Sequence, residues 1–258
     1  DAAAYDVVLY RNPGAVTAFA TTWTSQNVGT SGGDVLQLKI GDLDRDGDLD
    51  LVTGDASRAL LAWQNQGTPF GTSWPLAVAI GDGNYPADAV YGLVLVDLMH
   101  DGHLDVVAGT GTAGAYELVS YNNAGFPFSS GWSQTLVGAL QDTGWALAVG
   151  DLDQDGDGDL VAGTGAAETY QVQAWANERA AQGFAFGALA GDVGTATGNV
   201  SALLAADFNQ DGKPDLAAAD AADNLNLWQN PGSPFGGAWA TSVTAHANTF
   251  PYTALATA

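Results

Sequence analysis

A nine-residue acidic segment recurs four times along the chain at an almost constant spacing. Successive copies start 55, 54 and 56 residues apart, at Asp42, Asp97, Asp151 and Asp207. Each copy lies between two short apolar runs, as Leu36–Ile40 and Leu51–Val52 show for the first copy. A fixed period of this length over several copies indicates a repeat protein whose units stack on one another.

The remainder of each unit repeats as well. A third apolar run ends in an aromatic residue that is followed two positions later by Asn, in the pairs Trp63/Asn65, Tyr121/Asn123, Trp175/Asn177 and Trp228/Asn230. A Phe comes next, with a Trp four residues after it, in Phe70/Trp74, Phe128/Trp132 and Phe235/Trp239. The third unit has Phe186 but lacks the Trp. Gly, Asn and Pro separate the runs, so each unit predicts about four short strands, which is typical of a β-propeller blade.

The two ends of the chain predict one further, divided blade. The second half of a unit is matched near the N-terminus by Tyr10, Asn12, Phe19 and Trp23, and its first strand is matched by Tyr252 to Ala258. We therefore predict an all-β fold, a single β-propeller domain over residues 1–258 with four-stranded blades. The most direct interpretation is five blades, with a split closing blade (1–33 plus 248–258) and repeats at about 34–87, 88–142, 143–199 and 200–247.

The split blade lacks an acidic loop, and three interpretations stay open for it. The closing blade is incomplete, or the chain is part of a longer propeller or array, or a neighbouring molecule supplies the missing strand.

Each acidic segment spaces its oxygen side chains as a cation-binding loop does. In the first copy, Asp residues take positions 1, 3, 5 and 9, while Gly47 at position 6 permits a tight turn and position 7 can add its carbonyl. Ca²⁺ takes about six to eight such hard oxygen ligands, and four carboxylates without a cation repel one another. We predict up to four Ca²⁺ sites, with the ligands Asp42, Asp44, Asp46 and Asp50; Asp97, Asp101 and Asp105; Asp151, Asp153, Asp155 and Asp159; and Asp207, Asn209, Asp211 and Asp215.

The second loop is expected to be the weakest site, because Met99 stands at its third position and a thioether is a poor Ca²⁺ ligand. The EF-hand is excluded, because it requires flanking helices and Glu at position 12, where this chain has Thr53, Ala108, Ala162 and Ala218. The alternative without metal is a set of solvated Asp-Gly turns.

The charge of the chain is strongly negative. It has 6 Lys and Arg against 29 Asp and Glu, a formal net charge of −23, and sixteen of the acids lie in the four loops. Such a chain repels nucleic-acid phosphates and anionic membrane surfaces, so we expect no nucleic-acid partner and no membrane insertion. Cysteine is absent, which excludes disulfides.

The succession of strand, D-x-D-x-D-G-x-x-D loop and strand resembles the FG-GAP/VCBS repeats of integrin α-subunit propellers and of related bacterial and fungal lectin-like propellers. The resemblance extends over essentially the whole chain. It implies Ca²⁺ in a loop at the start of each blade and a secreted protein at an extracellular or cell-surface location. Most such propellers have seven blades, whereas this chain has material for five.

These features predict a non-catalytic adhesion or recognition module that binds a protein or glycan ligand at the cell surface or matrix. One alternative is a lectin-like propeller, in which Trp74, Trp132 and Trp239 stack on sugar rings between blades instead of packing the blades together. The other is a subunit of an extracellular filament, self-associated by strand exchange through the incomplete end blade. We expect no enzyme, because nothing outside the loops combines an acid, a base and a nucleophile, and we expect His100, His103 and His246 to lie in surface loops.

Overall fold

The computed structural model describes residues 6–14, 23–71, 73–81, 89–111, 117–129, 131–140, 142–165, 172–180, 183–186, 191–240, 243–247 and 255. All regular elements in these ranges are β-strands, and they build four four-stranded sheets and two two-stranded ones. The predicted all-β propeller of four-stranded blades is thereby confirmed. Within the described ranges no helix is long and apolar enough to cross a membrane.

The chain begins with a two-stranded sheet, which we call the N-terminal sheet, and continues into the first complete blade. The N-terminal sheet consists of β1 (Asp6–Arg11) and β2 (Thr24–Thr30), paired antiparallel. Blade A consists of β3 (Val35–Gly41), β4 (Asp50–Asp55), β5 (Leu60–Trp63) and β6 (Val78–Ala79), which lie side by side in chain order.

Three further blades repeat this meander. Blade B consists of β7 (Val90–Val96), β8 (Asp105–Thr110), β9 (Glu117–Asn123) and β10 (Trp132–Ala139). Blade C consists of β11 (Ala146–Gly150), β12 (Asp159–Gly163), β13 (Val172–Trp175) and β16 (Gly191–Gly194). Blade D consists of β17 (Val200–Ala206), β18 (Asp215–Asp220), β19 (Asn224–Trp228) and β20 (Val243–Ala247).

Blade C contains an insertion that accounts for the missing Trp of the third unit. Along the chain, a separate hairpin of β14 (Asn177–Ala180) and β15 (Gly183–Phe186) is inserted between β13 and the outer strand β16, which pair directly with each other. Phe186 therefore belongs to this hairpin and not to a Phe-to-Trp turn.

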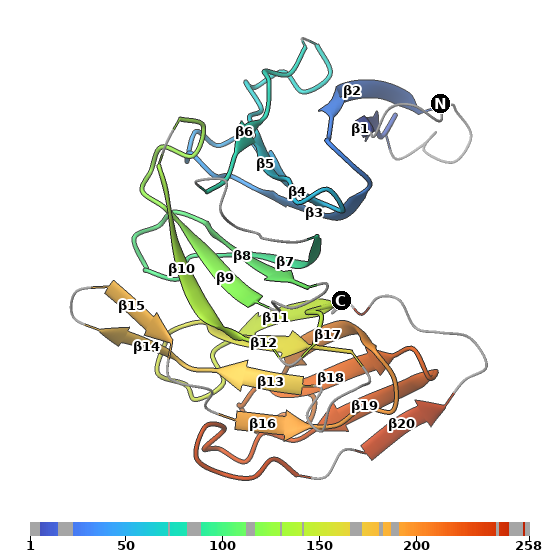
Figure 1. Ribbon diagram of the computed structural model, residues 1–258, viewed down its shortest axis with the longest axis vertical. Helices are drawn as coiled ribbons and strands as arrows, with labels where there is room; N and C mark the ends of the chain where they lie inside the picture. Colours follow the sequence, from blue (N-terminus) through green and yellow to red (C-terminus); the bar gives the residue numbers. More distant parts are fainter. Residues whose placement is uncertain are drawn as a thin grey trace.

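The blades follow one another along an arc, with the N-terminal sheet at one end and blade D at the other (Figure 1). Apolar clusters fill the spaces between successive members of this series. Examples are Val7 and Val28 against Trp63 of blade A, and Leu118 of blade B against Trp175 of blade C. The core is therefore a row of interfaces between sheets.

Each interface places an aromatic ring of one blade against a glycine of the preceding sheet. A Cβ on Gly194 would lie 2.5 Å from Trp228 Nε1, and a Cβ on Gly138 would lie 2.7 Å from Trp175 Nε1. Gly81 and Gly29 meet Tyr121 and Trp63 in the same way. We call each of these positions a slot glycine, because a side chain at the glycine would overlap the aromatic ring of the next blade.

In blades B, C and D, the Asn of the aromatic-x-Asn pair ties its blade to the preceding one. Its side-chain Nδ2 donates to the carbonyl of the residue at the second position of the preceding acidic loop, at distances of 2.8, 3.1 and 2.8 Å for Asn123→Leu43, Asn177→Leu98 and Asn230→Leu152. All three amides are buried, where an unpaired polar group costs about 1–3 kcal/mol. These bonds therefore fix the register between blades.

The tryptophans of the Phe-to-Trp turns fold back on their own turns. Their Nε1 atoms donate to Pro carbonyls five residues earlier, in Trp74→Pro69 (3.1 Å), Trp132→Pro127 (2.8 Å) and Trp239→Pro234 (3.0 Å). All three also pack against the apolar clusters between blades. This arrangement favours the packing role over a platform for sugar rings.

The predicted fifth blade stays a prediction. Tyr10 lies in β1, Asn12 follows that strand and Trp23 precedes β2, whereas Phe19 and the segment Tyr252–Ala258, apart from Leu255, lie outside the described residues. His246 lies in β20, so the expectation of a surface loop was wrong for this residue.

Substituting a slot glycine tests the interface between blades. Gly194→Ala is expected to lower the free energy of unfolding by about 1–3 kcal/mol, because the new methyl group overlaps the Trp228 ring and the core must shift. Chemical denaturation measures the change. Gly236→Ala is the matched control, since no atom lies within 4 Å of its added Cβ; equal stability of the two variants would contradict the slot.

Candidate metal centre

All four acidic loops share one backbone and connect the first two strands of their blades. The fourth residue of each loop has a left-handed φ, at 64°, 52°, 65° and 63° for Arg45, His100, Gln154 and Gln210. The glycine at position 6 also has a positive φ, between 87° and 96° in the four loops. A side chain at such a φ costs about 1–2 kcal/mol, so the loops hold the same strained turn whatever their acidic content.

The Asp at the ninth position is buried in every loop and ties the loop to the third strand. Its Oδ2 accepts the N–H of the second loop residue, and its Oδ1 accepts the N–H of the Asn that follows the aromatic residue. For Asp50 these bonds run from Leu43 at 3.0 Å and from Asn65 at 2.8 Å. The same pairs of bonds form at Asp105, Asp159 and Asp215.

The Asp at the first position distinguishes the loops from one another. Its Oδ2 accepts the glycine N–H in all four loops. In the second and fourth loops the other oxygen is also used, because Asp97 Oδ1 and Asp207 Oδ1 each accept the N–H of the fifth residue at 3.1 Å. In the first and third loops, Asp42 Oδ1 and Asp151 Oδ1 are buried and have no hydrogen-bond partner among the described residues.

These two loops also bring several carboxylates together. Oxygens of Asp42, Asp44 and Asp50 lie within 4.8 Å of one another, and so do oxygens of Asp151, Asp153 and Asp159. Among the described His, Asp and Glu residues, no such group forms at the Asp97 or Asp207 loops. Converging carboxylates with a buried, unpaired oxygen fit a hard divalent cation, and Ca²⁺ is the ion that prefers oxygen ligands in a flexible cage.

The fourth loop satisfies its polar groups internally. Asn209 Oδ1 accepts the N–H of Asp211 at 2.8 Å, and its Nδ2 donates to Asp211 Oδ2 at 3.2 Å. The Lys213 ammonium also lies 3.5 Å from Asp211 Oδ2. The backbone N–H of Lys213, followed by Asn209 and the Lys213 charge, holds the pKa of Asp211 below its usual value. In this loop the Lys213 ammonium and the Asn209 amide therefore stabilise the negative charge of Asp211.

Not every predicted ligand takes part in these groups. Asp46 and Asp155, at the fifth positions, lie outside them and accept the N–H of the seventh residue instead. The first and third loops, which gather three carboxylates, are called the complete loops below, and the second and fourth the incomplete loops. The predicted ligands of the incomplete loops share the same backbone conformation without forming such a group. The assignment of all fifteen residues as metal ligands stays a prediction.

The ninth-position carboxylates of the first three loops are costly to ionise. Burial raises the pKa of Asp50 and of Asp105 to about 6 and that of Asp159 to about 7, and the charges of neighbouring loop carboxylates add to this effect. The two backbone hydrogen bonds that each of them accepts only partly offset it. A divalent ion at the complete loops would favour the ionised form.

Sequence reasoning missed a second set of buried carboxylates. Asp55 and Asp220 end the second strands of blades A and D, and both are buried. Asp55 accepts bonds from Ser31 and Gly33 as well as from its own turn. Burial opposes ionisation of both groups, but these hydrogen bonds outweigh it and hold each pKa below the usual value. A sequence signal was present, since both lie at the fourteenth position counted from the first Asp of their acidic loop.

Comparison with known families agrees with the repeat structure. The family described as FG-GAP-like repeat matches twice, over residues 42–108 and 97–162. The two matches begin at the first and second acidic loops and include the third. No curated protein matches the chain. The two matches lie within residues 42–162 and, together with the four-stranded blades, support an FG-GAP β-propeller.

Proposed function

We propose that the protein is a calcium-stabilised recognition module that acts outside the cell and attaches to another macromolecule. FG-GAP propellers are typically non-enzymatic and typical of extracellular proteins. The observation that carries the calcium proposal is the pair of buried oxygens, Asp42 Oδ1 and Asp151 Oδ1, which have no partner among the described residues. Each stands within a cluster of three carboxylates.

The residues that would hold the ions are those of the two complete loops. Asp42, Asp44 and Asp50 would bind one Ca²⁺, and Asp151, Asp153 and Asp159 the other. The ion would neutralise the converging carboxylates and hold the hairpin between the first two strands of a blade in one conformation. Because only the folded chain assembles these ligands, binding stabilises the fold by mass action. Extracellular calcium modules have dissociation constants on the order of 10⁻⁴–10⁻³ M.

A specific surface feature favours a glycan as one class of ligand. A groove of about 250 Å³ lies between the first acidic loop and the turn Phe126–Ser129 of blade B, and Asp44 and Gln64 also line it. The Phe126 ring is 69% exposed. An exposed ring beside polar side chains suits a sugar, which offers an apolar face and hydroxyl groups.

Calcium removal tests the metal proposal. In calcium at about 100 times the dissociation constant, each filled site is expected to add about 2.7 kcal/mol to the free energy of unfolding, so the melting temperature should fall clearly in EDTA. Asp42→Asn and Asp151→Asn each replace a carboxylate by a neutral carboxamide. Each substitution should remove one site from a calorimetric titration with CaCl₂. Asp97→Asn is the matched control and should change the titration little. A melting curve that is identical with calcium and with EDTA would refute structural calcium.

The raised pKa values predict opposite pH responses with and without calcium. Without calcium, the folded chain binds more protons than the unfolded chain between about pH 4 and 7, so these carboxylates should make the protein more stable as the pH falls through about 7. Calcium competes with those protons, so the stabilisation by calcium should grow from pH 5 to pH 8. Thermal melts at both pH values, with CaCl₂ and with EDTA, measure this. A calcium effect that is larger at pH 5 would contradict the assignment.

Ligand binding is tested on arrays of glycans and of immobilised matrix proteins, in CaCl₂ and in EDTA. The proposal expects calcium-dependent binding on one of the arrays. If glycans are bound through the groove, Phe126→Ala should abolish glycan binding, whereas Leu76→Ala, which alters an equally apolar exposed side chain elsewhere, should not. No binding on either array in calcium would count against a recognition module.

A further inference from the structure

The interface between blades recurs along the arc. Each blade turns one face, which we call the forward half, to the following blade and the opposite face, the backward half, to the preceding one. The forward half is exposed at blade D. Phe208 takes the second loop position there and is 45% exposed, whereas Leu43, Leu98 and Leu152 at the same position are at most 1% exposed. Among the described residues, no side chain donates a hydrogen bond to the Phe208 carbonyl, although the equivalent carbonyls accept from Asn.

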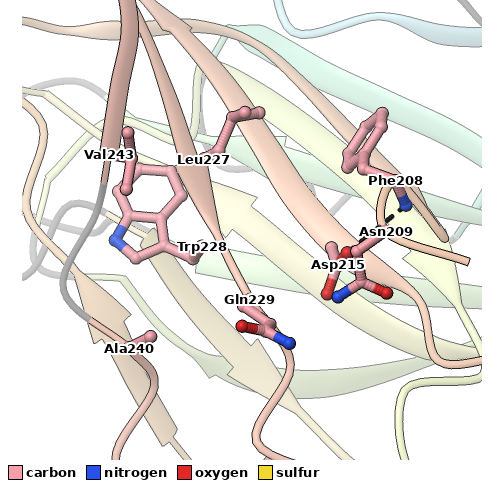
Figure 2. A pocket seen from close by; sticks show the side chains of 8 residues that line it. All are labelled: Phe208, Asn209, Asp215, Leu227, Trp228, Gln229, Ala240 and Val243. Atoms are coloured by element: carbon pink, nitrogen blue, oxygen red, sulfur yellow. Dashed lines mark hydrogen bonds between the residues drawn. The ribbon is translucent and has the colours of Figure 1, made fainter. Parts of the chain in front are cut away.

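A cavity occupies this exposed side of blade D. It has a volume of about 360 Å³, and Phe208, Leu227 and Val243 line it from three different parts of the blade. Figure 2 shows the side chains that line the cavity, among them Phe208, Leu227 and Val243. Val243 of β20 pairs with Leu227 of β19. Val243 is 65% exposed. The cavity is lined mainly by apolar side chains, with Asn209, Asp215 and Gln229 as its polar members.

The backward half of the same interface is exposed at the N-terminal sheet. Tyr10 is 62% exposed, whereas the equivalent Trp63, Tyr121, Trp175 and Trp228 are at most 3% exposed. Val8, two residues earlier on β1, is exposed as well. Asn12 repeats the local geometry of the bridging Asn residues, because its Oδ1 accepts the N–H of Gly14 at 3.0 Å as Asn123 Oδ1 accepts the N–H of Gly125 at 2.9 Å.

We propose that these two surfaces bind each other between copies of the chain, so that the N-terminal sheet of one copy packs on blade D of the next. Asn12 Nδ2 then donates to the Phe208 carbonyl, as Asn123 does to Leu43. Within one chain the two surfaces lie at opposite ends of the arc (Figure 1), so a second copy is the occupant that needs no rearrangement. The contact is face to face and exchanges no strand.

The two halves of this interface differ, so the contact is heterologous. Such a contact produces head-to-tail chains or closed rings and not a two-fold dimer. The net charge of −23 opposes association, so salt should strengthen the contact by screening. The proposal rests on the apolar faces and not on calcium, so association is expected in EDTA as well, wherever the fold persists.

One residue makes this contact weaker than those within the chain. The register of β19 and β20 pairs His246 with Leu225, and the same register position is Gly29, Gly138 and Gly194 in the other sheets. Those glycines leave the slot for the aromatic ring of the next blade. Blade D has His246 at this register position in place of a glycine, so a reversible association is expected.

A mixing experiment tests the proposal by sedimentation velocity, in CaCl₂ and in EDTA. The wild-type chain is expected to associate with rising concentration. Phe208→Glu blocks one half and Tyr10→Glu blocks the other, so each variant alone should stay at the monomer mass of 26.3 kDa. An equimolar mixture should form a one-to-one dimer, because each variant keeps the half that the other lacks. His246→Gly should tighten the wild-type association by about tenfold, equivalent to about 1.4 kcal/mol.

The controls separate this contact from general stickiness or misfolding. Leu76→Glu, at a side chain that is 94% exposed, should associate like the wild type, and the two blocking variants should keep the wild-type melting temperature in calcium. A monomeric wild type at all concentrations would overturn the proposal. So would failure of the mixture to form a dimer when both variants are folded. Association that appears only after residues 248–258 are deleted would show that the chain covers blade D with its own end.

Discussion

The architecture depends on one buried carboxylate per blade, the Asp at the ninth position of each acidic loop. Its two oxygens accept the N–H of the second loop residue and the N–H of an Asn on the far side of the third strand, as at Asp50 and Asp159. A hydrogen bond to a charged group contributes about 1.5–3 kcal/mol, against the cost of burying the charge. The carboxylate therefore holds three strands in register, and at Asp50 and Asp159 the same group belongs to the candidate metal site.

The same Asn carries the connection into the preceding blade. The Asn230 side chain donates to the Leu152 carbonyl, the Leu152 N–H donates to Asp159, and Asp159 accepts from the N–H of Asn177, which continues the series toward blade A. At the start of the series, Asn65 donates to the Leu49 carbonyl of its own loop instead. Neighbouring bonds in such a chain polarise and strengthen one another. The acidic loops and the interfaces between blades consequently belong to one hydrogen-bond network, so a change in the conformation of a loop alters the neighbouring interface.

The sequence predicted the blades and the loops because their signals are local and periodic. The acidic spacing, the aromatic-x-Asn pairs and the Phe-to-Trp turns each repeat once per unit, and the unit without its Trp carries the inserted hairpin β14–β15. The slot glycines were not foreseen, because four positions such as Gly194 do not stand out among 34 glycines until strand register places them opposite a ring. Nor does spacing separate the two roles of Asp50, since a metal ligand and a buried hydrogen-bond acceptor require the same residue. Asp55 lies outside the loop motif, and its role depends on Ser31 and Gly33, more than twenty residues away.

Loops that gather three carboxylates alternate along the chain with loops that do not, and neighbouring loops are in contact. The strained fourth residue of each of the first three loops reaches the following loop: Arg45 Nη1 donates to the Asp101 carbonyl at 3.5 Å, His100 Nδ1 lies 3.5 Å from Asp157 Oδ1, and Gln154 donates to the Gly212 carbonyl. Each incomplete loop is therefore in contact with a complete one. Since the incomplete loops satisfy their own first-position oxygens through backbone N–H groups, they keep the common turn without an ion. Under the proposed function, an ion held by the first or third loop would therefore restrain two neighbouring blades.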